Sequence, residues 1–371
     1  MTLHQTTVTI FKGIKWSAIL GGVLVLLIMT FNIGRILLRI INPPPPDYPT
    51  VAFGKLPALS FPDPLINESF VYSINTISGL LPVFPDRVTI QRIVNPTITL
   101  SNVSNARSKV RKIGFENSGE NKFSEEVITP TSYKWQKVTN GLLRSITINT
   151  DTYDFKLSST YRTYPPILNQ SVISDEKNIK ALTSKFLSNM AYDITDIDLE
   201  NAKLQSFKLG KGGALVPAES VSATQIFRLN LHQKPINELP VFYPVHPNSS
   251  IYFLFMARSH DEDDVLEANF THQIVATESA TYPIKTADEA FEELKKGNGF
   301  ISNYFGTERN IAITDVTLGY FFSDVRQGYT LPVVLFQGKG DFFAFVPALK
   351  EACLTTSSET IDTCQGKILK E

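Results

Sequence analysis

The chain is poor in cysteine and in charge for its length of 371 residues. Its two cysteines, Cys353 and Cys364, exclude a scaffold held by several disulfides and a zinc site with four cysteine ligands. Charged residues make up 19% of the chain, and 35 Lys and Arg balance 36 Asp and Glu. A net charge of −1 does not supply the basic surface of a nucleic-acid-binding protein, so we expect no nucleic-acid partner.

The chain also lacks the short motifs of common catalytic sites. It contains no G-x-S-x-G, H-E-x-x-H, C-x-x-C or Walker loop. Its histidines are scattered, and His246 lies between prolines, which is typical of a loop. The acidic run from His260 to Asp264, with Glu267, has no glycine for a calcium-binding turn and predicts a solvated turn. We therefore expect no catalytic residue, metal, cofactor or small-molecule substrate, and the chain is predicted not to be an enzyme.

One stretch is long and apolar enough to cross a bilayer. Trp16 to Gly34 carries no charge, and its 19 residues as a helix cover about 30 Å of hydrocarbon. Arg35 and Arg39 lie four residues apart and can reach the headgroups, so the predicted helix spans 16–41. A cleaved signal peptide is the alternative, but the apolar region is long and no small-x-small cleavage site follows it.

The predicted helix carries small residues on one face. Ser17 and Gly21 lie four residues apart, as do Ala18 and Gly22, and such a face lets another helix approach closely in a bilayer. Simple exposure to lipid is the alternative. Flanking positive charges are balanced, but a short N-terminus followed by a first apolar helix is typical of a signal anchor. We expect a cytoplasmic tail at 1–15 and an extracytoplasmic body.

Beyond the predicted helix, the sequence divides into a linker, a large body and a short tail. The linker, 42–65, contains four consecutive prolines and favours a stiff extended spacer. The body is predicted as a first module at 66–170 and a second at 171–350, followed by a C-terminal tail at 351–371. The tail holds both cysteines, and a bond between them would suit an oxidising compartment, although two reduced thiols are the alternative.

Helical and strand patterns alternate along the body. Helices are predicted at 101–113, 175–190 and 286–297; in the last, Thr286 and Glu289 form a capping box. The first helix carries Arg107, Lys109, Arg111 and Lys112, which predict a solvated face. Strands are expected between the helices; they are 142–148, 153–157, 226–231, 251–256, 311–322, 331–336 and 342–346. Helices followed by antiparallel strands predict an α+β fold.

The C-terminal quarter resembles a known family. The segments Tyr282–Gly297, Val316–Phe322, Leu331–Gly338 and Phe343–Leu349 look like the C-terminal module of the YycH/YycI proteins, which are also similar to PepSY domains. Those proteins are single-pass, extracytoplasmic accessories of a cell-wall sensor histidine kinase. The resemblance implies a membrane-anchored interaction or regulatory protein with a sensor-kinase-like partner. A structural protein of the cell envelope is the alternative, and an enzyme of unrecognised type is a more remote one.

Overall fold

The computed structural model describes residues 26–32, 48–63, 69–94, 99, 101–116, 123–139, 141–164, 168, 174–258 and 264–366. The chain divides into two compact units, Met1–Tyr48 and Pro49–Glu371. In the first unit, residues 26–32 are helical and exposed. Among the described residues, no helix has both the length and the apolar character needed to cross a membrane. The remainder of the predicted span, 16–25 and 33–41, lies outside the described residues.

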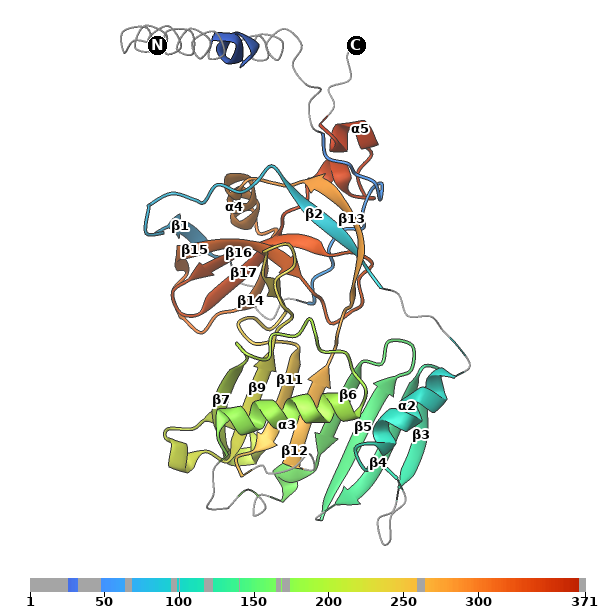
Figure 1. The fold of residues 1–371 in the computed structure, drawn as a ribbon. Helices are drawn as coiled ribbons and strands as arrows, with labels where there is room; N and C mark the ends of the chain where they lie inside the picture. Colours follow the sequence, from blue (N-terminus) through green and yellow to red (C-terminus); the bar gives the residue numbers. More distant parts are fainter. Residues whose placement is uncertain are drawn as a thin grey trace, which may run out of the picture. The chain divides into compact units, whose positions relative to one another are not determined.

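The larger part of the second unit is one nine-stranded antiparallel sheet (Figure 1). Its strand order is β3 (Ser124–Thr129), β4 (Ser132–Thr139), β5 (Leu142–Asn149), β6 (Phe155–Ser159), β12 (Val265–Phe270), β11 (Ile251–Met256), β9 (Ile226–Leu231), β7 (Lys203–Leu209) and β8 (Leu215–Pro217). Strands from both sides of residue 170, the boundary predicted between the two modules, therefore belong to the same sheet.

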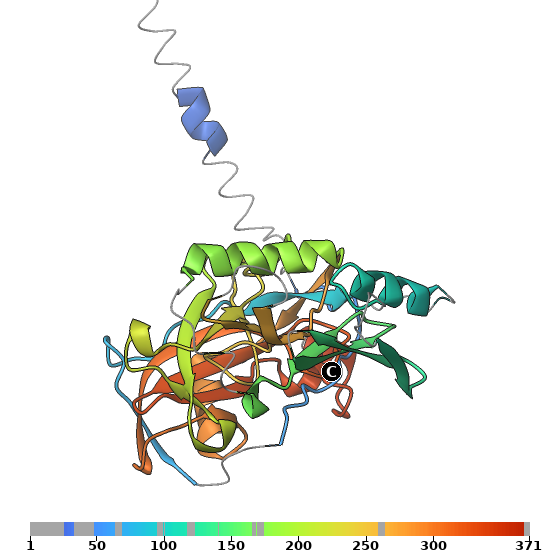
Figure 2. The same ribbon diagram turned by 90° about the horizontal axis from the view of Figure 1, so that it is seen from below.

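This sheet consists of two similar halves. Each half begins with a helix, α2 (Asn102–Arg111) or α3 (Glu176–Asn189), and continues into antiparallel strands; β3 to β6 are neighbours in chain order, whereas in the second half β7 pairs with β9 and β8 forms the edge. The last strands of the halves, β6 and β12, pair with each other in antiparallel register. Both helices lie on the same side of the sheet (Figure 2), where Val110 of α2 and Phe186 of α3 join one buried cluster with Trp135. The predicted hairpin at 142–157 is confirmed as β5 and β6.

A second sheet follows along the chain. Its order is β1 (Val71–Ile74), β15 (Asn310–Phe321), β16 (Leu331–Gly338), β17 (Phe342–Pro347) and β14 (Phe300–Asn303), and β10 (Val241–Phe242) also pairs with β15. β1 and β10 run parallel to β15, whereas the other pairs are antiparallel. Two further strands, β2 (Arg87–Ile93) and β13 (Val275–Pro283), form a separate antiparallel ribbon.

The local signals in the sequence correspond closely to these elements. The capping box predicted for Thr286 and Glu289 is present at the start of α4 (Ala287–Lys295), and the apolar side of α4 is buried in the core beside the second sheet. Asp175 caps α3 by accepting a hydrogen bond from the Asn178 backbone. The strands predicted at 226–231 and 251–256 are β9 and β11. The expected α+β class is confirmed.

The ends of the second unit are packed together. Val51 and Leu56 are buried, so the predicted linker at 42–65 joins the folded unit at Pro49 and only the chain before that residue falls outside the unit. Leu56 forms a parallel bridge with Leu354, next to a short helix η6 (Glu351–Cys353). After η6, helix α5 (Ile361–Cys364) brings Cys364 back to Cys353. The predicted disulfide is confirmed, and both of its cysteines are buried.

Candidate functional site at the junction of the two sheets

A network of polar side chains joins the loops of the nine-stranded sheet to the loop that follows β15. Asp154 lies in the β5–β6 turn, Asp196 follows α3, and His272 lies between β12 and β13. The His272 Nε2 atom lies 2.9 Å from both carboxylate oxygens of Asp196. The His272 backbone donates to Asp154 Oδ1 at 3.0 Å. Arg326, from the loop after β15, places Nη2 3.7 Å from Asp154 Oδ2 and links this network to the second sheet.

Three glutamines continue the network. Gln233 Nε2 donates to Asp196 Oδ2 at 2.9 Å and to the Gln273 carbonyl at 3.0 Å. Because both partners are acceptors, they fix the orientation of the Gln233 amide. Gln273 donates in turn to the Ser323 carbonyl at 2.9 Å and accepts from the Gln327 backbone at 3.1 Å. The Gln233 Oε1 atom is buried and has no hydrogen-bond partner among the described residues.

A pocket of about 330 Å³ opens beside His272 and Asp196. Its lining is mixed: the polar lining residues include Asp193, Thr195, Asp196, Gln233 and Lys234, and the apolar ones are Pro235, Ile236, Ile274 and Val275. A hydrogen bond from the Thr195 backbone lowers the pKa of the Asp193 carboxyl. Lys234 Nζ donates a hydrogen bond to the Thr195 carbonyl at 2.6 Å. The pocket therefore presents carboxylate acceptors and suits an ammonium or guanidinium group on an apolar stem.

Burial has a different effect on Asp154, deeper in the network. Loss of solvent raises the pKa of the Asp154 carboxyl, although hydrogen bonds from Thr152 and the His272 backbone and the nearby Arg326 oppose this change. The residue is therefore a structural acceptor at the base of the network. Asp193, in contrast, is exposed, so its carboxylate is accessible to a ligand that enters the pocket from solution.

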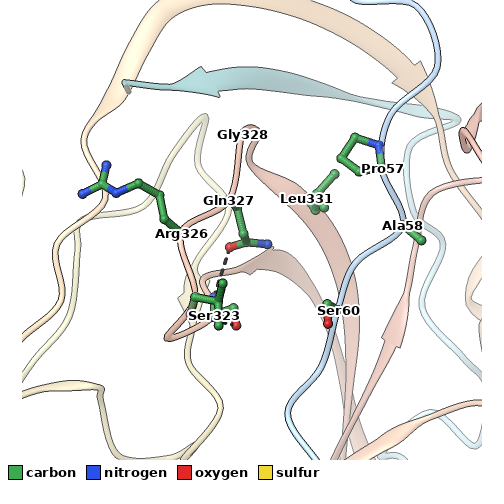
Figure 3. Close-up of a pocket in the computed structure, with 9 residues that line it drawn as sticks. Pro57, Ala58, Ser60, Ser323, Arg326, Gln327, Gly328 and Leu331 are labelled. Atoms are coloured by element: carbon green, nitrogen blue, oxygen red, sulfur yellow. Dashed lines mark hydrogen bonds between the residues drawn. The ribbon is translucent and has the colours of Figure 1, made fainter. Parts of the chain in front are cut away.

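A second pocket, of about 190 Å³, is lined by the loop after β15 and by residues 57–60 (Figure 3). Pro57, Ala58 and Ser60 form one wall, and Gln327, Gly328 and Leu331 lie opposite. The Gln327 Oε1 atom accepts from the Ser323 backbone at 3.1 Å, and Arg326 points away from this pocket in Figure 3. Gln273, which lies in the chain between His272 and Ile274 of the first pocket, is hydrogen-bonded to Ser323 and Gln327 of the second.

These pockets do not provide a metal centre. Over the residues that the structure covers, no group of three or more His, Cys, Asp or Glu side chains could hold a metal ion. Glu267, considered above with the acidic run at 260–264, instead pairs with Arg162 at 3.1 Å. Residues 259–263 of that run lie outside the described residues.

The solvated basic face predicted for the first helix is present at Arg107, Arg111 and Lys112, which are exposed, but not at Lys109, which is half-buried. Arg107 makes a two-pronged ion pair with Glu125, with Nη2 2.7 Å from Oε1, and this pair lowers the pKa of Glu125. Lys109 turns inward, donates to the Met190 carbonyl at 2.8 Å and lies 4.1 Å from the Tyr192 ring centroid. Burial lowers the pKa of Lys109 to about 8. The prediction of a solvated basic face is therefore wrong at Lys109, because that side chain joins the two halves of the sheet.

The other predicted contact residues are not described. Ser17, Ala18, Gly21 and Gly22, the small-residue face of the predicted membrane helix, lie outside the described residues. The residues of the junction were not singled out by the sequence, since Asp154, Asp196 and His272 come from loops far apart in the chain. The local signal was weak: His272 lies two residues after Phe270, at the end of the strand-like run 265–270.

Comparisons with known proteins return few matches. No protein-family model and no curated protein matches the chain. Among solved structures, an uncharacterised protein from Eubacterium rectale is similar, with 12% identity and a TM-score of 0.35, covering 71% of this chain and 85% of that one. The YpeB C-terminal domain of Bacillus megaterium is also similar, with 10% identity and a TM-score of 0.34, covering 69% of this chain and 95% of that domain.

Proposed function

We propose that the chain is a single-pass membrane-anchored, extracytoplasmic interaction protein that regulates a membrane partner such as a sensor kinase. The observation that carries this proposal is the uncharged stretch Trp16–Gly34, followed by a proline run and then by a large folded unit that begins at Pro49. An apolar stretch of that length is suited to a bilayer. The partner is a protein that contacts the helix, the body or both.

Two surfaces supply the contacts in this proposal. The small-residue face of Ser17 and Gly21, with Ala18 and Gly22, provides close packing against a partner helix. The junction pocket provides a second contact, in which Asp193 and Asp196 accept a lysine or arginine side chain of the partner. Its volume of about 330 Å³ is enough for one such side chain but is at the small end for a metabolite site.

The first test is of topology and of the helix contact. Protease added to spheroplasts is expected to digest the body while residues 1–15 stay protected; full protection of the body would overturn the orientation. The double variant Gly21→Leu, Gly22→Leu is expected to reduce co-purification of the partner in mild detergent. Val25→Leu, on the same helix, is the matched control. If the double variant retains every membrane complex, the helix is only an anchor.

An enzyme is the second candidate, because the junction pocket holds a histidine–carboxylate pair. His272 is 8% exposed, and its Nε2 is held by Asp196. Such a pair can act as a general base only when a ring nitrogen faces the substrate. Here Nε2 is directed into the network that joins the sheets, so we rank a binding role first. Turnover of any substrate that is abolished by His272→Gln, with the fold intact, would reverse this order.

A further inference from the structure

The second pocket contains a hydrogen-bond donor without a partner. The Gln327 Oε1 atom accepts from the Ser323 backbone at 3.1 Å. Because a backbone N–H can only donate, this contact fixes the orientation of the Gln327 amide and leaves Nε2 on its other side. Nε2 is buried and has no hydrogen-bond partner among the described residues, and in Figure 3 it is directed toward the side on which Leu331 and residues 57–60 lie. Burial of a donor without an acceptor is unfavourable, so this atom indicates a place for an acceptor in the pocket.

The facing wall of the pocket is a stretch of chain whose backbone is unpaired. Residues 58–61 belong to no helix or strand, and their backbone makes no hydrogen bond to any described residue. The ring centroid of Phe61 lies 5.1 Å from that of Phe300 and 5.0 Å from that of Phe321. Leu59 packs against the same aromatic cluster. Side chains therefore hold this stretch in place, while its amides and carbonyls remain available as they are on the edge strand of a sheet.

The pocket offers no charge to a ligand. Arg326 is the only charged residue of its lining. Its Nη1 donates to the Val94 carbonyl at 3.0 Å and its Nη2 to the His272 carbonyl at 3.4 Å, so the guanidinium is turned away (Figure 3). Pro57 and Leu331 add apolar surface. A charged ligand group would lose its water here without gaining a counter-charge, which favours an uncharged ligand.

We propose that this pocket binds an extended, uncharged peptide segment of a partner protein. The segment pairs with the backbone of residues 58–61 and places one of its carbonyl oxygens at Gln327 Nε2. Such pairing takes its affinity from main-chain hydrogen bonds and its specificity from a pocket for a side chain. The volume of about 190 Å³ suits one small apolar side chain and is below that of a metabolite site. The site requires neither the membrane anchor nor the carboxylates of the junction pocket, so the inference goes beyond the proposed function.

The test measures hydrogen exchange by mass spectrometry on the full chain in detergent micelles, with its disulfide intact. The probe is a blocked, uncharged peptide, acetyl-Thr-Val-Ala-Val-Thr-amide. We expect the probe to slow exchange at 58–61 several-fold, because the amides of these residues become hydrogen-bonded. The same peptide with every central residue N-methylated cannot pair and is expected to have no effect. Fluorescence anisotropy of a labelled probe gives its affinity.

The variant Gln327→Glu removes the free donor and keeps an oxygen that accepts from the Ser323 backbone. It is expected to weaken binding of the probe about 10-fold or more, because the peptide carbonyl then faces a carboxylate. Gln136→Glu, at a partly buried position of β4 in the nine-stranded sheet, is the matched control. The melting temperature of each variant is measured as well, and the N-methylated peptide tests the pairing on the unchanged chain.

The possible outcomes distinguish this site from the junction pocket. Equal binding of the N-methylated peptide, or binding that Gln327→Glu leaves unchanged, overturns the pairing. No slowing of exchange at 58–61 overturns the site, since water then satisfies Gln327. Slowing at 233–236 that is lost in Asp193→Asn places the peptide in the junction pocket, which overturns this site and leaves the proposed function standing.

Discussion

Gly319 of β15 leaves the space that the ring of Phe242 occupies. A Cβ atom placed on Gly319 would overlap the Phe242 ring and lie 2.6 Å from the Pro240 carbonyl oxygen. Phe242 of β10 pairs in parallel with Phe321 of β15. In the chain, β10 lies between β9 and β11 of the nine-stranded sheet, and this close approach to Gly319 allows it to join the second sheet instead. The two sheets are thus connected by a backbone contact that only glycine permits.

Gly319→Ala is therefore expected to destabilise the fold by about 1–3 kcal/mol, because the new methyl group forces β10 away from β15. Thermal or denaturant unfolding of the full chain measures the loss. Gly328→Ala is the control, since a Cβ there meets nothing within 4 Å. Equal stability of the two variants would show that β10 tolerates displacement.

Acidification should destabilise the protein through His246. Burial lowers the pKa of His246 to about 4, with smaller contributions from His232 and Lys203, and the ring packs edge-on against Phe242 and Phe343. Between pH 6.5 and pH 4 the unfolded chain binds a proton that the folded chain does not, so stability falls as the pH falls. By linkage this amounts to about 2 kcal/mol at pH 4.5.

The variant His246→Leu isolates this contribution. Unfolding of the variant is expected to depend less on pH than unfolding of the native chain between pH 7 and pH 4.5, because leucine has no proton to bind. Circular dichroism melts at several pH values give the two slopes. Identical slopes would mean that other groups cause the acid sensitivity.

Removal of the disulfide should loosen two segments that are distant in sequence. In the double variant Cys353→Ser, Cys364→Ser, the loop of about 12 residues is no longer closed, which costs about 3 kcal/mol in the chain-entropy model. The Leu56 backbone donates to the Cys353 carbonyl at 2.9 Å, so the start of the body is expected to fray together with the tail. Amide exchange should accelerate at Leu56 and Thr355 but not in β16. Mass spectrometry that finds two free thiols in the native chain would contradict this assignment.

The junction pocket makes a separate prediction about partner binding. Asp193→Asn removes one exposed carboxylate and is expected to weaken binding of the partner about 5- to 10-fold, with little change in melting temperature, because Asp193 is exposed. Asp315→Asn, on an exposed position of β15, is the matched control. Affinity of the purified complex, measured at low salt, gives the comparison. Equal affinities of both variants would remove the pocket from the interface.

The sequence predicted elements whose signals are local. Thr286 and Glu289 define the start of α4 within a few residues of chain, and the apolar run at 251–256 defines β11 without reference to its partners. The pairing of β1 and β10 with β15 left no such signal, because parallel pairing depends on segments more than 70 residues away. The pairing of β6 with β12 likewise left no local signal, because these strands can pair only after both halves of the sheet have formed.

The candidate site was less predictable for a related physical reason. His272 and Asp196 are 76 residues apart, and neither lies in a motif. Lys109 was misjudged because helical spacing places it beside exposed basic residues, whereas a tyrosine from the second half covers it.

The bridge between Leu56 and Leu354 gives the molecule a mechanical property. Any pull transmitted along residues 42–48 acts on the start of the body, where the Thr50 backbone and hydroxyl and the Val51 backbone are hydrogen-bonded to Thr281. Under tension, these hydrogen bonds can break one after another. At Leu56 the load meets two backbone bonds, one to Cys353 and one from Thr355, on a segment closed covalently by the disulfide. Tension on the linker is therefore resisted first at β13, through Thr281, and then at the segment closed by the disulfide, before it reaches β1 and the rest of the second sheet.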